Sequence, residues 1–167
     1  SYNVPSVKLG MAVGLDEVAY TINRLGVVKD ITQLPALTLG AVDLSPLQVN
    51  QMYQTIANNG VLNELHALNA VTSNENELLY LRAVPSEVRA DESATYLVNY
   101  ALHKVTLEGT ASAVRRAFPN VNMAGKTGTT NDYRDSWFAG FDRNLVTSVW
   151  MGADDNAPVN LSGASGA

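Results

Sequence analysis

Residues 124–140 read Ala124-Gly-Lys-Thr-Gly-Thr-Thr-Asn-Asp-Tyr-Arg-Asp-Ser-Trp-Phe-Ala-Gly140. This stretch predicts two strands, over residues 122–130 and 136–141, joined by a polar connection. A third apolar run, over 145–152, follows the short polar turn at 142–144, so the last two strands are predicted to form a hairpin. The end of the chain is therefore expected to be an antiparallel meander.

Helical patterns dominate the sequence before these strands. Ser45 is a strong helix start, because a serine cap, Pro46 in the first turn and Gln48 three residues later favour a capping box. Helices are predicted over residues 3–14 (which Asn3 could cap), 15–25, 45–59, 91–107 and 111–118, a loop with a short strand over 30–39, and a hairpin from 66–72 and 77–84. Within 91–107 the pattern places these side chains inward: Tyr96, Leu97, Tyr100, Leu102 and Val105. Helices followed by antiparallel strands predict an α+β fold.

Composition narrows the function classes. The 167 residues fit one globular domain, with 46% hydrophobic and 16% charged residues and a net charge of −5. The absence of a basic stripe argues against a nucleic-acid partner, and no segment is long and apolar enough to contact a membrane as a span. The absence of cysteine excludes disulfides, thiolate metal sites and a cysteine nucleophile. His66 and His103 are far apart in the sequence, and neither has a cluster of carboxylates around it at the spacing of metal ligands. We therefore expect no metal site and no cofactor.

The run from Lys126 to Thr129 carries the strongest functional signal. Alternation along a strand places Thr127 and Thr129 on one face, where two hydroxyls could hold a carboxylate. Gly128 would allow close approach of a ligand or backbone, and Lys126 supplies a positive charge. The plainer interpretation is an edge strand with a solubilising lysine. A phosphate-binding P-loop is disfavoured, because Asn120 stands where its first glycine is needed.

Ser1-Tyr2-Asn3 is the only Ser-x-Asn in the sequence, and alone it would be no more than a capping turn. Paired with Lys126-Thr-Gly128, it resembles the motif set of penicillin-binding proteins and serine β-lactamases. The longer string 124–140, together with Trp150-Met-Gly-Ala-Asp-Asp-Asn156, resembles the class A, bifunctional penicillin-binding proteins, most closely their Gram-negative 1b subtype. The resemblance implies a partial penicillin-binding protein fold, a helical region followed by strands of the active-site sheet.

The resemblance also implies an activity for the parent protein. It would be a peptidoglycan D,D-transpeptidase, in which a serine is acylated by a stem peptide ending in D-Ala-D-Ala and then released by an amine of a second stem peptide. β-Lactam antibiotics would acylate the same serine. The family further implies an upstream glycosyltransferase domain and an N-terminal membrane anchor, which would place the protein on the periplasmic side of the bacterial inner membrane.

The resemblance assigns roles by position. Ser1 would relay a proton toward the leaving nitrogen, and Asn3 would hydrogen-bond the donor peptide and help to position a catalytic lysine. Lys126 would tune that relay electrostatically. The substrate-binding strand would comprise Thr127, Gly128 and Thr129; the two threonines would hold the terminal carboxylate, and the Thr129 N–H would supply half of the oxyanion hole.

One motif of the family is missing. No serine in the chain has a lysine three positions later, so the nucleophilic Ser-x-x-Lys is absent. We therefore expect residues 1–167 to be the C-terminal portion of a transpeptidase domain that begins at the Ser-x-Asn motif. The upstream part of the same domain, as a continuous chain or a separate fragment, would be an obligatory partner, and the fragment alone would be inactive.

Two other functions remain open on the same fold. A serine β-lactamase would hydrolyse its acyl-enzyme with a glutamate, but no Glu-x-x-x-Asn string occurs in the chain. A non-catalytic β-lactam sensor or interaction module would keep the binding strand without turnover. Cross-linking activity of the complete domain would distinguish these from a transpeptidase.

Overall fold

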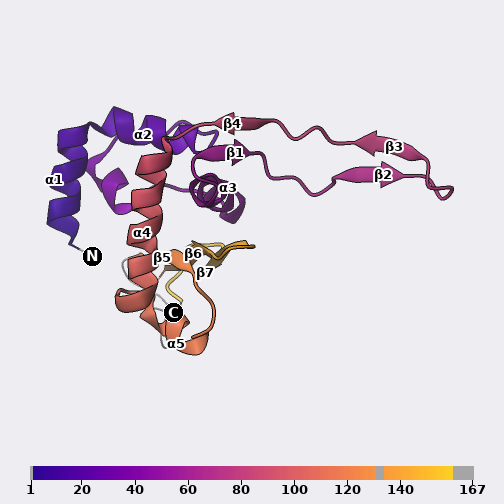
Figure 1. Cartoon of the computed structure of the whole chain (residues 1–167). Coiled ribbons are helices and arrows are strands. Elements are labelled where there is room, and N and C mark those ends of the chain that lie inside the picture. Colours follow the sequence, from indigo (N-terminus) through magenta and orange to yellow (C-terminus); the bar gives the residue numbers. More distant parts are fainter. Residues whose placement is uncertain (1, 131–133, 160–167) are drawn as a thin grey trace.

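The structure, a computed structural model, describes residues 2–130 and 134–159. Helices precede the main antiparallel sheet, which confirms the predicted α+β order (Figure 1). The elements are α1 (Asn3–Val13), α2 (Leu15–Arg24), the 3₁₀ helix η1 (Pro35–Leu39), α3 (Pro46–Ala57), β1 (Val61–Asn63), β2 (Ala70–Thr72), β3 (Leu78–Leu81), β4 (Ser86–Val88), α4 (Glu92–Glu108), α5 (Ser112–Ala117), β5 (Ala124–Thr129), β6 (Asp135–Phe141) and β7 (Val146–Gly152). Within the described ranges, no helix combines the length and apolar character needed to cross a membrane.

The predicted start of α3 is confirmed, but two other local predictions are wrong. Ser45 caps α3 through a complete capping box, in which its side chain accepts from the Gln48 N–H and the Gln48 side chain accepts from the Ser45 N–H. Asn3 does not cap α1: it is the first helical residue, and Tyr2 in the cap position makes no side-chain hydrogen bond. The predicted short strand within 30–39 is wrong, because Pro35 opens a 3₁₀ helix there.

Strands β5, β6 and β7 form the predicted meander. Both pairings are antiparallel in the order β5-β6-β7, which leaves β5 at one edge. The turn between β6 and β7 is held by Asp142, whose carboxylate accepts from the N–H groups of Asn144 and Leu145 at 2.7 and 2.8 Å. These two hydrogen bonds lower the pKa of Asp142. Polar side-chain capping of a tight turn explains why this hairpin was readable from sequence.

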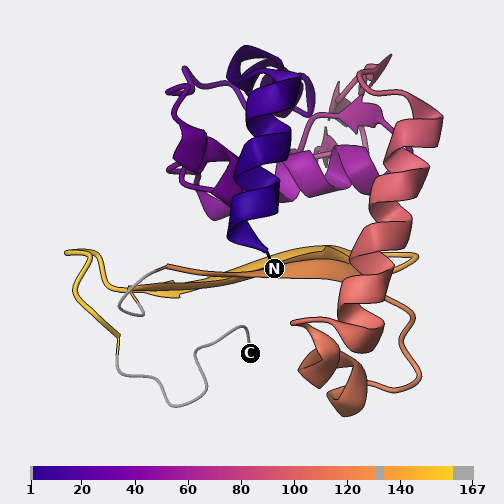
Figure 2. The same ribbon diagram turned by 90° about the vertical axis from the view of Figure 1, so that its left-hand side faces the viewer.

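Two helices position the sheet. Helix α3 lies over one face, where Asn50 Oδ1 is 3.4 Å from Ser148 Oγ of β7 (Figure 2). Helix α4 stands at the edge formed by β5, and its Thr106 hydroxyl donates to the Met123 carbonyl at 2.7 Å. His103 Nδ1 lies 3.1 Å from the same carbonyl. The start of β5 is therefore clamped to α4 by two side chains.

The inward face of α4 differs from the prediction. Tyr96, Leu97 and Tyr100 were expected to be buried but are 66%, 65% and 55% exposed. The buried residues of this helix are Thr95 and Thr106. Thr106 faces the segment before β5, because its hydroxyl donates to the Met123 carbonyl, whereas the Thr95 hydroxyl donates to carbonyls at the start of its own helix. Leu102 and Val105, which were also predicted to point inward, are half-buried.

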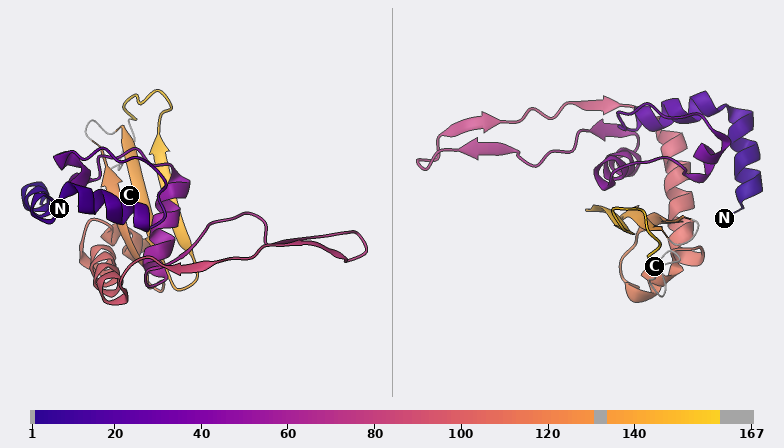
Figure 3. Two further views of the ribbon diagram at one scale, coloured as in Figure 1. Left: turned by 90° about the horizontal axis from the view of Figure 1, so that it is seen from above. Right: turned by 180° about the vertical axis from the view of Figure 1, so that it is seen from behind.

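A long hairpin arm projects from the body (Figures 1 and 3). The predicted hairpin is confirmed as β2 and β3, and all four residues of β3 are exposed. At its base, β1 and β4 pair antiparallel, with Val61 opposite Val88. These two three-residue strands were not predicted, because they are too short for a periodic pattern and pair across more than twenty residues.

The chain exposes more surface than a compact protein of its size. Its accessible surface is 11,156 Å², whereas a compact monomer of 17.9 kDa is expected to expose about 8,000 Å². The exposed large apolar side chains include those of β3 and of the outer face of α4. An apolar surface of this extent is typical of an interface with further polypeptide.

Candidate active site on strand β5

The predicted functional residues of β5 lie along the free edge of the main sheet. Lys126, Thr127, Gly128 and Thr129 pair with β6 on one side only. Among the described residues, no strand pairs with the other edge of β5. The backbone of this segment can therefore receive an extended ligand, which agrees with the strand interpretation and not with a P-loop, whose lysine would open a helix.

The two glycines of β5 serve the sheet in different ways. A Cβ on Gly125 would come within 2.8 Å of Phe138 Cζ and 2.9 Å of the Ala139 carbonyl oxygen, so this position needs glycine for strand packing. A Cβ on Gly128 would meet Trp137 Cβ at 3.2 Å. The close neighbour of Gly128 is thus a tryptophan of β6, which the sequence had not linked to the site.

Lys126 is half-buried and points to the same face as Gly128 and Trp137. Its Nζ donates to the Thr127 carbonyl oxygen at 2.7 Å. Burial lowers the pKa of Lys126, because removal from water disfavours the charged amine. The strand therefore presents a partly desolvated amine whose proton is easier to release than that of an exposed lysine.

The two predicted carboxylate ligands share a face but differ in environment. The register places Thr127 opposite Phe138 and Thr129 opposite Ser136, as expected for alternate residues of one strand. Thr129 is exposed, whereas Thr127 is only 7% exposed and its hydroxyl lies 2.8 Å from that of Thr110. Thr110 lies between the predicted helices 91–107 and 111–118, and no spacing rule connects it with β5.

The start of α1 reaches the level of the sheet on its β5 side (Figures 1 and 2). Asn3 is exposed, and within residues 2–130 and 134–159 it makes no hydrogen bond to β5. Ser1, the predicted proton relay, lies outside the described residues. The structure thus places the start of α1, with Asn3, on the same side as the β5 edge, without a direct hydrogen bond between them.

Other groups of polar residues have structural roles. Asp135 opens β6 and accepts from Trp150 Nε1 at 2.7 Å, which fixes the indole that packs against Trp137 with ring centroids 6.4 Å apart. His66 contacts the Glu64 carbonyl and the Asn69 side chain. Across the described part of the chain, no three His, Asp or Glu side chains gather as a metal site.

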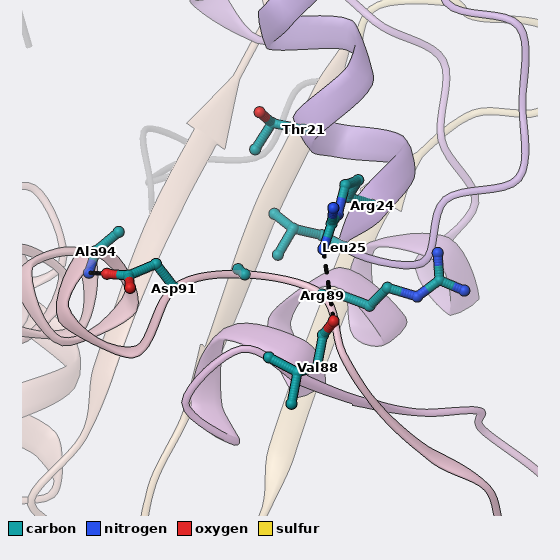
Figure 4. A pocket seen from close by; sticks show the side chains of 8 residues that line it. Thr21, Arg24, Leu25, Val88, Arg89, Asp91 and Ala94 are labelled. Atoms are coloured by element: carbon teal, nitrogen blue, oxygen red, sulfur yellow. Dashed lines mark hydrogen bonds between the residues drawn. The ribbon is translucent and has the colours of Figure 1, made fainter.

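A cavity of about 470 Å³ lies away from β5, between the end of α2, β4 and the start of α4 (Figure 4). Arg24 on its wall donates through Nη2 to the Val88 carbonyl at 3.5 Å, and Asp91 caps α4 at the Ala94 N–H. None of the residues predicted for the site lines this cavity. The candidate site on β5 is therefore separate from this cavity.

The chain matches a known family over nearly its whole length. The model of the penicillin binding protein transpeptidase domain matches residues 1–163. Penicillin-binding protein 1B of Vibrio cholerae is 46% identical over 168 aligned residues, and that of Escherichia coli is 44% identical. These alignments cover 100% of the chain but only 22% and 20% of the two relatives. The chain thus spans about a fifth of the length of these curated relatives.

Solved structures share the fold. Penicillin-binding protein 1A from Haemophilus influenzae superimposes with a TM-score of 0.87 at 24% identity, covering 98% of this chain and 30% of that one. Penicillin-binding protein A from M. tuberculosis, as an imipenem acyl-enzyme complex, gives a TM-score of 0.76 at 19% identity, covering 96% of this chain and 42% of that one. These similarities confirm the expected partial penicillin-binding protein fold.

Proposed function

Because the chain belongs to the penicillin-binding protein transpeptidase domain family, we propose that it is the C-terminal portion of a peptidoglycan D,D-transpeptidase domain. The observation that carries this proposal is the Lys126-Thr-Gly-Thr129 strand on an open sheet edge, with the start of α1 on the same side. The parent protein would cross-link cell-wall stem peptides and would be acylated by β-lactams.

The donor stem peptide would lie along the free edge of β5. A serine would attack the penultimate D-Ala carbonyl, D-Ala would leave with a proton on its nitrogen, and an amine of a second stem peptide would release the acyl group. The Thr129 N–H would donate to the developing oxyanion, worth about 3 kcal/mol for one such donor in other acyl-transfer enzymes. Thr127 and Thr129 would hold the terminal carboxylate.

Lys126 and Ser1 would act in proton transfer, and Asn3 would position the donor peptide. The lowered pKa and half-buried amine of Lys126 support a role in which its charge biases the proton relay through Ser1 to the leaving nitrogen. Asn3, exposed at the start of α1, is free to hydrogen-bond the donor peptide and the lysine of the missing motif.

The nucleophile would come from another part of the parent chain. The sequence contains no Ser-x-x-Lys, and the chain exposes roughly 3,000 Å² more surface than a compact protein of its mass. Both observations support an upstream segment that completes the domain and covers the apolar faces. From the same resemblance, the parent would carry a glycosyltransferase domain and lie on the periplasmic side of the inner membrane.

Mass spectrometry after incubation with benzylpenicillin tests the proposal. We expect a covalent adduct on the parent protein and none on residues 1–167 alone. An adduct on the isolated chain would contradict the assignment of the nucleophile to an upstream segment. The parent should also cross-link lipid-linked precursor; rapid turnover of nitrocefin without cross-linking would instead support the hydrolase, and adduct formation with neither activity would support a sensor.

A further inference from the structure

The hydroxyls of Thr127 and Thr110 form a direct pair at the site. Their oxygens are 2.8 Å apart, the Thr127 side chain is almost fully buried, and Thr110 lies in the connection between α4 and α5. Thr110 therefore contacts a residue of the binding strand from outside the sheet. Thr110 belongs to none of the family motifs recognised in the sequence, and no role was predicted for it.

Thr110 is held in place by the fold around it. A Cβ on the preceding Gly109 would come within 2.8 Å of Val105 Cα, so glycine lets the chain pass close to the last turn of α4. The following Ala111 is completely buried, and its N–H donates to the Val105 carbonyl. Since α4 is itself tied to β5 through Thr106, the position of the Thr110 hydroxyl relative to the strand is set by packing on both sides.

Only one proton can lie between two hydroxyl oxygens, and this decides what Thr127 can bind. A hydroxyl has a single proton to donate, whereas an ionised carboxylate can only accept. If Thr127 donates to Thr110, it has no proton left for a carboxylate. If Thr110 donates to Thr127, the Thr127 proton is free, and the two hydrogen bonds reinforce each other.

We propose that Thr110 is a positioning residue that donates to Thr127 when a carboxylate binds and thereby orients the Thr127 hydroxyl toward it. The inference rests on the proposed function, in which Thr127 holds the terminal carboxylate of the donor peptide. In the free site, Thr127 donates to Thr110; on binding, the pair reverses direction without movement of either oxygen. Selectivity for a free carboxylate over its neutral derivatives thus depends on a residue that need not touch the ligand.

The test compares benzylpenicillin with benzylpenicillin methyl ester in the full-length parent protein. The measured quantity is the ratio of their second-order acylation rate constants, called here the carboxylate selectivity. Thr110→Val, which keeps the shape and removes the hydroxyl, should lower this ratio about threefold to tenfold, the effect of one neutral hydrogen bond. Thr110→Ser should restore it to within about twofold, because serine retains one donor.

Thr106→Val is the matched control. It removes a different hydroxyl between α4 and β5, so it should lower the unfolding temperature and slow both probes with little change in their ratio. Thr110→Ala replaces Thr110→Val if the valine variant does not fold. An unchanged ratio in the Thr110 variants, or an equal fall in Thr110→Ser, would overturn the inference.

Thr127→Val separates this inference from the proposed function. It should lower the carboxylate selectivity by about tenfold to a hundredfold, as expected for a hydrogen bond to a charged group. If Thr127→Val lowers the ratio and Thr110→Val does not, only the role of Thr110 fails. If Thr127→Val also leaves the ratio unchanged, the carboxylate role of Thr127 itself fails, and the role of Thr110 fails with it.

Discussion

Lys126 shows how partial burial changes the acidity of a side chain. Its amine is half-buried on β5 and donates to the adjacent Thr127 carbonyl, and burial lowers its pKa. In the unfolded chain the amine would be fully hydrated and would titrate at its ordinary pKa of 10.5. Folding therefore favours proton loss from this residue.

We predict that the amine of Lys126 titrates with a midpoint below pH 10.5 in the parent protein. The ¹³C chemical shift of the adjacent ε-carbon in labelled lysine measures this midpoint. Lys126→Arg should remove this signal and thereby assign it. Between the folded and unfolded pKa values the unfolded chain binds more protons, so Lys126 opposes folding at neutral pH and this opposition fades as the pH rises. A midpoint at or above 10.5 would contradict the effect of burial.

Gly125 and Gly128 should respond differently to alanine. Gly125→Ala places a methyl group within 2.9 Å of two atoms of β6, so we expect a loss of about 1–3 kcal/mol in the free energy of unfolding. Gly128→Ala meets only Trp137 Cβ at 3.2 Å and should cost less. Thermal unfolding of the two variants of the parent protein measures the difference; equal destabilisation would contradict the packing argument.

At the scale of elements, α3 and α4 fix the sheet from two directions. The complete capping box of Ser45 starts α3 above β6 and β7, while Thr106 and His103 of α4 hold the strand preceding Lys126. The lysine and threonines therefore extend from a strand anchored at its beginning. The outer edge of β5 remains open, because among the described strands β5 pairs only with β6.

Tyr53 makes α3 sensitive to alkaline pH. Burial raises its pKa to about 12 from 10.0, so the unfolded chain loses this proton before the folded chain does. Stability from Tyr53 is thus complete below pH 10 and is lost as the pH rises toward 12, by up to about 3 kcal/mol. Tyr53→Phe should flatten the fall in unfolding temperature between pH 10 and 12; an unchanged slope would contradict this.

Most elements were predictable because their signals are local. Caps, turn residues and apolar periods marked the five α-helices, the β2–β3 hairpin and the three-stranded sheet. The inward face of α4 was predicted only in part, because Leu102 and Val105 are half-buried but Tyr96 and Tyr100 are exposed. The hydrogen bond by which Thr106 ties α4 to the segment before β5 carries no hydrophobic period and so could not be recognised.

At the scale of the whole molecule, the chain exposes an unusually large surface for its mass. The chain exposes 11,156 Å², and the arm formed by β2 and β3 extends from the body with Leu78–Leu81 all exposed (Figure 3). An isolated two-stranded hairpin is marginally stable in water. The arm would therefore be stabilised by any surface that packs on its exposed apolar side chains.

We predict that residues 1–167, expressed alone, bind the dye ANS strongly and self-associate in analytical ultracentrifugation. The physical reason is the apolar surface on β3 and the outer face of α4. Co-expression with the upstream part of the parent chain should reduce dye binding and restore a defined stoichiometry. A monomeric isolated chain without dye binding would show that this surface does not require a cover.

The sequence by itself determined the α+β order, the hairpin turns, the family motifs and the candidate residues of β5, because each is encoded by neighbours in the chain. Only the tertiary structure decided that Thr127 is buried against Thr110, that Trp137 lies beside Gly128 and that burial changes the pKa of Lys126. These features depend on contacts between elements far apart in sequence. Burial and hydrogen-bond direction are properties of such contacts, and no local pattern of residues specifies them.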